Sequence, residues 1–409
     1  MATVKKFKAV RPNPAYADKV SSLPYDVMNE QEARAMAKDN AYSYLHVDRS
    51  EIDFPEGIDP HTQPVYEKAA SNLQQMLSQG VMLQDSQDCL YIYKLNSQIG
   101  LVCTTSIDET LDNTIKKHEL TRPDKEDDRV NHIDYCNANT SPIFLTYRAN
   151  TNIDTIINDY ISSTEPIYNF TLDDDVTHTV WKIDDDDVCN MIIQQFANIP
   201  NLYIADGHHR NASAVRVAQK RRLEHPDYTG DEEFNFYLSV LFPDNQLNIL
   251  DYNRVVTDLN GLTSNEFLAT LKEKFDVQVT TGSYKPQQPA QYGMYLDGVW
   301  HILTAKPEII SDDCIKGLDV SILQDNILQP LLGIDDPRTS TRINFVGGIR
   351  GVLELERLVD TGHYKVAFSL YPTSMEQLLA VADTSNVMPP KSTWFEPKLR
   401  SGLFLHLLS

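Results

Sequence analysis

Long apolar runs are missing from this sequence, and so are Gly/Ser-rich and Pro/Gly-rich tracts. The first absence excludes a transmembrane helix, and the second argues that the whole chain folds. No apolar stretch follows the basic start of the chain, so we expect no secretion signal. These absences predict a cytoplasmic protein without a membrane partner.

Cysteine is scarce, odd in number and widely spaced. The five residues are Cys89, Cys103, Cys136, Cys189 and Cys314. No C-x-x-C pair occurs among them, which argues against a disulfide framework and a zinc ribbon. We expect reduced thiols, as is usual in a cytoplasm.

Positive charge is in short supply, with 36 Lys and Arg residues against 58 Asp and Glu residues and a net charge of -22. Such a charge repels the backbone of DNA or RNA, so we expect no nucleic-acid partner. An anionic substrate would need a local cluster of basic residues or backbone amides.

The chain, with 409 residues, exceeds the size of one hydrophobic core. We predict an α/β (α+β) fold with three regions. They are 1–110, a core over 111–230 with an insertion at about 150–198, and 231–409, which we expect to pack as one body with the rest.

Apolar periodicity and turn residues predict the elements. In the first half they indicate a helix capped by Asn29, a helix over 66–77, a hairpin over 90–105 turning at 96–98, a helix over 115–120, a strand over 142–147 and a helix over 153–161. In the second half they indicate strands over 176–183, 202–205, 237–242, 293–303 and 364–371, and helices over 211–223, 264–275, 319–332 and 374–383. The acidic clusters at 173–175 and 184–187 lack the glycine and spaced glutamate of a calcium loop, so we expect solvated loop ends.

The strongest functional signal is Asp206-Gly207-His208-His209-Arg210, directly after an apolar strand. Gly207 permits a tight turn, and the helix that follows directs free N–H groups and its positive dipole end at a ligand. Two imidazoles and a guanidinium add donors that suit phosphate. In one alternative Asp206 only caps the helix and the histidines pack or face solvent. In a second alternative the histidines bind metal, although adjacent histidines diverge and suit a closed zinc site poorly.

A second cluster runs from Lys116 to Arg122 and continues with Lys125 and Arg129. It places the carboxylate of Glu119 among basic residues. Alone, this pattern favours a solvated ion-pair face. Together with the first cluster, it makes Glu119 the best candidate for a general base.

A third segment, 388–399, combines prolines, two lysines, two hydroxyls and Trp394-Phe395. It could contact an anion and stack on a base, or serve equally well as a carboxy-terminal strap. Residues 345–351 resemble a phosphate loop but lack the Gly-Lys-Ser/Thr ending, and no dinucleotide or hydrolase motif occurs.

Five motifs in a fixed order carry a resemblance that covers nearly the whole chain. They are residues 24–27 (Pro-Tyr-Asp-Val), 118–121 (His-Glu-Leu-Thr) with Arg129, 141–144 (Ser-Pro-Ile-Phe), 205–210 (Ala-Asp-Gly-His-His-Arg) and 389–393 (Pro-Pro-Lys-Ser-Thr) with Pro397-Lys398. With them the chain resembles a family catalogued as a domain of unknown function, within the ParB/sulfiredoxin-like superfamily, and is similar to the free serine kinases of that superfamily. About fifty residues separate Tyr147 from Leu202, which is longer than typical connections.

The resemblance implies a ParB/sulfiredoxin-like mixed core with large amino- and carboxy-terminal additions. It implies a nucleotide-dependent kinase that uses ATP or ADP and Mg²⁺ to phosphorylate a small free metabolite, with L-serine to O-phospho-L-serine as the first guess. Glu119 would deprotonate the hydroxyl, and Asp206 would position Mg²⁺ or the hydroxyl. The nucleotide phosphates would contact Gly207, His208, His209, Arg210, Lys391, Ser392 and Thr393, and the substrate would contact His118, Thr121, Arg129, Asp26 and Lys398.

Two rival functions stay open from the sequence. A non-catalytic nucleotide sensor would need the phosphate turn but no base, and a metal-dependent hydrolase would use His208 and His209 as ligands. The sequence leaves open the acceptor, the choice between ATP and ADP, the pathway and the oligomeric state, a homodimer included.

Overall fold

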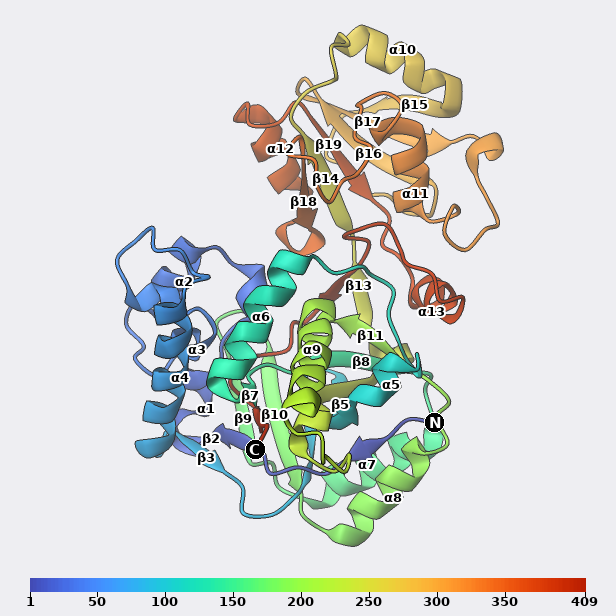
Figure 1. The fold of residues 1–409 in the computed structure, drawn as a ribbon. Helices are drawn as coiled ribbons and strands as arrows, with labels where there is room; N and C mark the ends of the chain where they lie inside the picture. Colours follow the sequence, from blue (N-terminus) through green and yellow to red (C-terminus); the bar gives the residue numbers. More distant parts are fainter. The chain divides into compact units, whose positions relative to one another are not determined.

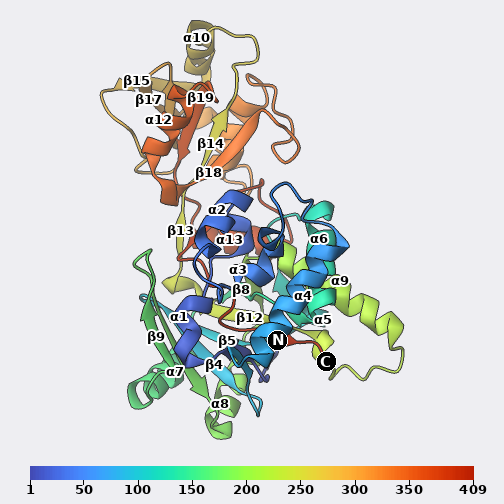
Figure 2. The same cartoon turned by 90° about the vertical axis from the view of Figure 1, so that its left-hand side faces the viewer.

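The computed structural model describes residues 1–409 as a mixed α/β chain, which confirms the predicted fold class (Figures 1 and 2). The chain forms two compact units. Unit 1 comprises residues 1–117, 121–247 and 397–409, and unit 2 comprises residues 118–120 and 248–396. None of the helices combines the length and apolar character that a bilayer crossing requires.

Unit 1 is built on a nine-stranded mixed sheet. Along it the strands are β6 (Ile115–Lys116), β11 (Leu202–Asp206), β8 (Ile143–Tyr147), β12 (Phe236–Pro243), β5 (Gln98–Ser106), β4 (Leu90–Leu95), β10 (Thr177–Ile183) and β9 (Tyr168–Thr171), with β1 (Val4–Lys5) paired to β5. The pairs β6 with β11 and β8 with β12 are parallel, and the others are antiparallel. Strands β8 and β11 are almost wholly apolar because both of their faces are covered.

The helices of unit 1 are α1 (Ala17–Val20), α2 (Glu30–Ala37), α3 (Leu45–Asp48), α4 (Gln63–Ser78), α5 (Ile107–Leu111), α6 (Pro123–Cys136), α7 (Thr151–Ser163), α8 (Asp186–Phe196) and α9 (His208–Glu224). Helices α4, α6 and α9 lie side by side (Figure 1). Two short sheets pair β2 (Val10–Pro12) with β3 (Met82–Gln84) and β7 (Ala138–Asn139) with β21 (His406–Leu407).

Several local predictions are confirmed. Asn29 caps α2 in a reciprocal pair of hydrogen bonds with Glu32. The predicted hairpin forms between β4 and β5, where Leu95 pairs with Gln98 across a two-residue turn. Asn96 in that turn has a φ of 52°, as this kind of turn requires.

The segment predicted as an insertion supplies α7, β9, β10 and α8, and its two strands extend the sheet at the edge opposite β6. The acidic residues at its end are not only solvated loop ends. Asp185 caps α8 by accepting hydrogen bonds from the amides of Asp187 and Val188, because carboxylates suit the positive end of a helix.

Two element predictions are wrong here. The expected helix over 115–120 is strand β6, because the buried Ile115 pairs with Leu202 inside the sheet, and a short apolar run alone does not distinguish strand from helix. The expected strand over 293–303 is a hairpin that turns at Asp297-Gly298, both with positive φ. The helix predicted over 211–223 is confirmed as α9, which begins earlier, at His208, directly after the Gly207 turn.

Unit 2 contains a six-stranded antiparallel sheet. Its order is β15 (Phe275–Thr280), β17 (Val299–Ala305), β16 (Gln291–Leu296), β19 (Val366–Leu370), β14 (Tyr252–Val256) and β18 (Ile343–Gly347). A small sheet pairs β13 (Asn248–Leu250) with β20 (Trp394–Glu396), and the helices are α10 (Ser264–Lys274), α11 (Asp319–Leu323), α12 (Val352–Asp360) and α13 (Met375–Asp383). The helix predicted over 319–332 is shorter: α11 continues only as a π-helical segment, Gln324–Leu328.

Candidate functional site

The turn from β11 into α9 has the geometry that its sequence predicts. β11 ends at Asp206, Gly207 adopts a φ of 92° and a ψ of 32°, and α9 runs for 17 residues from His208. The amides of the first helical turn have no partners within the helix, and the helix dipole adds positive potential there. The turn therefore has the local chemistry of an anion site.

Glycine is favoured at position 207 for two reasons. Its positive φ disfavours other residues, and a Cβ atom at this position would lie 3.1 Å from Nε and 3.2 Å from Cζ of Arg210. The guanidinium of Arg210 thus packs directly against the α-carbon of the turn.

Arg210 is buried, with 7% of its surface exposed. Its Nη1 donates a hydrogen bond to the carbonyl of Pro142, and its Nε has no hydrogen-bond partner. Burial alone would lower the pKa of Arg210, but the negative charges of Asp26 and Asp206 raise it. The structure therefore brings three predicted site residues, Asp26, Asp206 and Arg210, within electrostatic reach of one another.

Asp206 forms an ion pair with Lys398, whose Nζ lies 2.9 Å from Oδ2, and its Oδ1 accepts a hydrogen bond from the amide of Gly207. Burial acts to raise the pKa of Asp206, but Lys398 and then Arg210 outweigh it and hold this pKa far below its usual value. Lys398, predicted to bind substrate, is thus also the cation that stabilises the ionised Asp206.

We expect Lys398→Met to destabilise unit 1 by about 1–3 kcal/mol at neutral pH, because it leaves a mostly buried carboxylate without its cation. A depressed pKa contributes stability that is fully present above the unfolded value, about pH 4, and is lost as the pH falls towards the folded value. The difference between wild type and variant should therefore shrink below about pH 4. Urea unfolding between pH 3 and pH 7 measures it, and Lys8→Ala, at an exposed lysine of unit 1, is the control. A difference that does not change with pH would contradict the assignment.

The segment after β6 is anchored to unit 1 on both sides of Glu119. Lys116 pairs with Tyr203 of β11, and the amide of Arg122 donates a hydrogen bond of 3.1 Å to Nε2 of His209. The acceptor role of Nε2 places the proton of a neutral His209 on Nδ1. Thr121, predicted to bind substrate, donates its hydroxyl hydrogen to Glu126.

A small cavity of about 20 Å³ lies behind the turn in unit 1, with room for about one water. Its lining includes Tyr25, Arg129, His132, Ser141 and Arg210. The Arg129 guanidinium stacks 4.1 Å from the centre of the Tyr25 ring and pairs with its neighbour, the Asp128 carboxylate, at 2.8 Å. The cavity therefore has two buried guanidinium groups in its wall.

Sequence reasoning missed three buried polar residues near this cavity. Burial, and then Arg129, lower the pKa of His132, which favours a neutral ring. Asp48 accepts a hydrogen bond of 2.9 Å from the Ser141 hydroxyl, and its other oxygen has no partner. Asp128 pairs with Arg129. No local pattern distinguishes Asp48, and only the apolar spacing of α6 could have placed Asp128 and His132 on its buried face.

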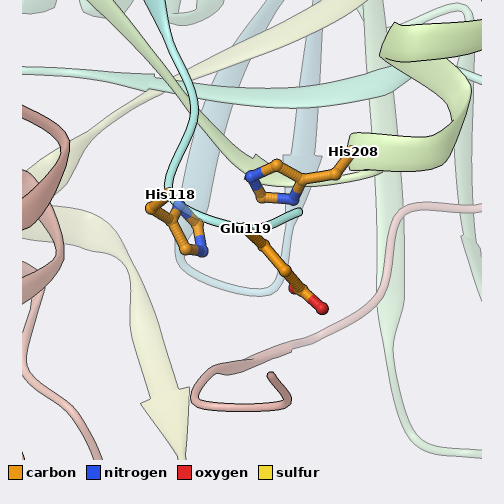
Figure 3. Close-up of side chains that lie close together, drawn as sticks. All are labelled: His118, Glu119 and His208. Carbon is orange, nitrogen blue, oxygen red and sulfur yellow. The ribbon is translucent and has the colours of Figure 1, made fainter. Parts of the chain in front are cut away.

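The remaining predicted residues belong to unit 2. His118 is buried and Glu119 is half-buried; they follow one another on the segment after β6, and Figure 3 shows their side chains, as well as that of His208 at the start of α9. The backbone carbonyl of His118 accepts a hydrogen bond from the amide of Met388. Nε2 of the His118 ring lies 3.5 Å from the Thr393 hydroxyl.

We call residues 388–393 the strap. Within the strap, the Ser392 hydroxyl donates a hydrogen bond to the carbonyl of Pro389. From outside the strap, the Thr373 hydroxyl donates one to the carbonyl of Ser392. Lys391 has a φ of 56°. The predicted residues Lys391, Ser392, Thr393 and His118 are thus close together in unit 2.

Comparison with known proteins gives one family. A family model described as "Protein of unknown function (DUF1015)" matches residues 4–321. This match confirms the family resemblance that the motifs indicate. No curated protein matches the sequence.

Three of the solved structures that match this chain have TM-scores below 0.5. A conserved hypothetical protein from Pyrococcus furiosus is 13% identical, with 75% of this chain and 95% of that chain covered and a TM-score of 0.36. A free serine kinase in complex with AMP is 12% identical, with 74% and 92% covered and a TM-score of 0.36. SbnI with a C-terminal truncation, from Staphylococcus aureus, is 12% identical, with 75% and 87% covered and a TM-score of 0.41.

Proposed function

The chain belongs to the DUF1015 family, and from this premise we propose that it is a nucleotide-dependent kinase acting on the hydroxyl of a small free metabolite. The first candidate reaction converts L-serine to O-phospho-L-serine. The observation that carries the proposal is the Gly207 turn, where the amino-terminal end of α9 lies over the buried guanidinium of Arg210.

In this proposal the nucleotide phosphates bind at the turn. The first amides of α9 would donate to phosphate oxygens, His208 and His209 would add imidazole donors, and Arg210 would add positive charge beneath. Nε2 of His209 already accepts a hydrogen bond from Arg122, so Nδ1 is the donor that we assign to this ring. Lys391, Ser392 and Thr393 would contact further phosphate oxygens. Phosphoryl transfer demands mainly alignment and charge neutralisation, which such a site provides.

Chain connectivity supports Glu119 as the base. Lys116 is the register partner of Tyr203 in β11, and Arg122 hydrogen-bonds to His209; each lies three residues from Glu119. Three residues span at most about 11 Å, so the Cα of Glu119 stays within that distance of both anchors, at about 3.6 Å per residue. We therefore assign Glu119 to remove the proton of the acceptor hydroxyl.

We assign Mg²⁺ to Asp206. Its two oxygens each accept one hydrogen bond, and a carboxylate has further lone pairs. One carboxylate together with phosphates and waters is a usual set of ligands for Mg²⁺. The ion would neutralise phosphate charge, and Lys398 would hold the Asp206 carboxylate in place.

The acceptor would lie beside the cavity behind the turn. Its two guanidinium groups, from Arg129 and Arg210, suit a carboxylate, and Asp26 suits an ammonium group. His118, Thr121 and Lys398 would complete the substrate contacts. This assignment favours small hydroxy amino acids over uncharged alcohols.

The test is a phosphorus NMR screen of hydroxyl metabolites with ATP or ADP. We expect a new phosphomonoester with serine, threonine or homoserine, and at least about tenfold less with serinol or ethanolamine, which lack the carboxylate. No product with any amino acid would remove the kinase assignment. Equal rates with serinol would remove only the carboxylate pocket.

The two rival functions give different results in simple assays. A sensor would bind nucleotide and never turn over. A hydrolase that uses His208 and His209 would retain one tightly held zinc after purification, which metal analysis would detect. The hydrogen bond from the Arg122 amide to Nε2 of His209 opposes the hydrolase. It uses the lone pair of Nε2 and leaves the proton of the neutral ring on Nδ1, so neither nitrogen of His209 is a ready metal ligand.

A further inference from the structure

Unit 2 buries a cation that has no anionic partner. Arg254, on β14, is 3% exposed. Its Nη1 donates to the carbonyl of Tyr252, its Nη2 donates to the carbonyl of Pro390 at 3.2 Å, and its guanidinium lies 5.2 Å from the centre of the Phe345 ring. All of these partners are neutral.

The three other buried arginines all have carboxylates near them. Arg129 pairs with Asp128 at 2.8 Å and Arg400 pairs with Asp174. Arg210 lies in the field of Asp26 and Asp206. Acidic residues outnumber basic ones in this chain, 58 to 36. Arg254 nevertheless has no carboxylate among its hydrogen-bond partners. Burying an unpaired charge costs several kcal/mol, and this burial lowers the pKa of Arg254 to about 10. A negative charge from outside the chain would offset the cost.

The strap brings a second cation to the same place. Arg254 holds the strap through Pro390, and the next residue, Lys391, has its Nζ 5.7 Å from the centre of the Tyr252 ring. The Trp394 ring packs edge-on against Tyr252, with 5.3 Å between ring centres. Tyr252 thus contacts both cations and fixes one end of the strap.

We propose that the strap and Arg254 form a binding site in unit 2 for a phosphate dianion. Lys391 and the Thr393 hydroxyl contact the ligand directly, and Arg254 is a positioning residue that supplies counter-charge and holds the strap. That the natural ligand of this site is a nucleotide rests on the proposed kinase function. That the site binds inorganic phosphate does not depend on that function.

The experiment titrates the full chain with inorganic phosphate by calorimetry, at constant ionic strength set with sodium chloride. We expect Arg254→Gln and Lys391→Ala to weaken this site at least about tenfold, because each removes one of the two positive charges. Arg254→Lys should retain most of the affinity. Lys272→Ala, at an exposed lysine of α10 in the same unit, is the charge-matched control and should change nothing.

A second background separates this site from the Gly207 turn. In Gly207→Ala, or in His209→Ala where the first variant does not fold, the turn is blocked and phosphate should still bind at the strap. Loss of all phosphate binding in that background would overturn the strap site and remove the strap from the proposed phosphate contacts, whereas the roles proposed for the Gly207 turn and Glu119 would stand. If Arg254→Gln in the otherwise wild-type chain loses all phosphate binding, the strap is the site that binds phosphate, and the result contradicts phosphate binding at the Gly207 turn. If Arg254→Gln does not fold, unchanged phosphate affinity in Lys391→Ala overturns the proposal. O-Phosphoserine, AMP and adenosine are titrated in the same way. Tighter binding of AMP than of O-phosphoserine would identify a nucleotide as the source of the phosphate, the reverse order would identify a phosphorylated product, and adenosine is the control without phosphate.

Discussion

Replacing Glu119 with glutamine is expected to lower the rate of phosphoryl transfer by about 10²–10⁴-fold while nucleotide affinity stays within about twofold. Glutamine has the shape of glutamate but cannot take a proton from the acceptor hydroxyl. The measurement pairs single-turnover rates with nucleotide binding by calorimetry, so that a loss of binding is not mistaken for a loss of chemistry.

The control for this substitution is Glu376→Gln, which makes the same chemical change at an exposed residue near the start of α13. Its rate should equal that of the wild type. Full turnover by Glu119→Gln would show that Glu119 is not the base. A wild type that binds nucleotide and never turns over would favour the sensor before any variant is made.

The local features of the candidate site could be predicted because neighbouring residues determine them. The turn at Gly207 is specified by the short apolar strand before it, the glycine itself and the helical repeat after it. These residues determine the turn without contacts from distant parts of the chain. The cap at Asn29 and the hairpin at Asn96 follow from the same kind of local hydrogen bonding. In each case the interacting residues are a few positions apart.

The partners that determine the charge state of the site could not be predicted in this way. Asp206 and Lys398 are 192 residues apart, and no spacing rule connects a strand end to a residue near the carboxy terminus. Ile115 shows the same limit for secondary structure. Its position beside Leu202 inside a sheet decides that it is a strand, and the local sequence does not contain that information.

Arg254 illustrates a different limit. In the sequence Arg254 is a single basic residue two positions after Tyr252, and no local pattern marks it. Its burial among neutral groups, which only the structure shows, makes it a candidate. The sequence predicts Lys391, Ser392 and Thr393 as anion contacts and leaves open whether the segment is only a strap. The hydrogen bond from Arg254 to Pro390 links a buried cation to this segment, which is the link that the proposed phosphate site uses.

Gly207→Ala is expected to destabilise unit 1 by roughly 2–5 kcal/mol, the sum of a backbone cost and a steric cost. A non-glycine residue at such a φ costs about 1–2 kcal/mol, and an added methyl group in a packed site costs about 1–3 kcal/mol. The new Cβ would lie 3.1 Å from Nε of Arg210, a side chain held in place by its hydrogen bond to Pro142. Hydrogen exchange of peptides from α9 measures the opening free energy of unit 1 alone.

A matched glycine separates these two costs. Gly57 has a φ of 85°, close to the 92° of Gly207, but a Cβ there would meet nothing within 4 Å. Gly57→Ala should therefore cost only the backbone share, about 1–2 kcal/mol. In an Arg210→Ala background the steric share should also vanish, so that Gly207→Ala then costs about as much as Gly57→Ala. If Gly207→Ala costs the same with and without Arg210, the guanidinium does not pack against the turn, and the phosphate site that we place there loses its supporting cation.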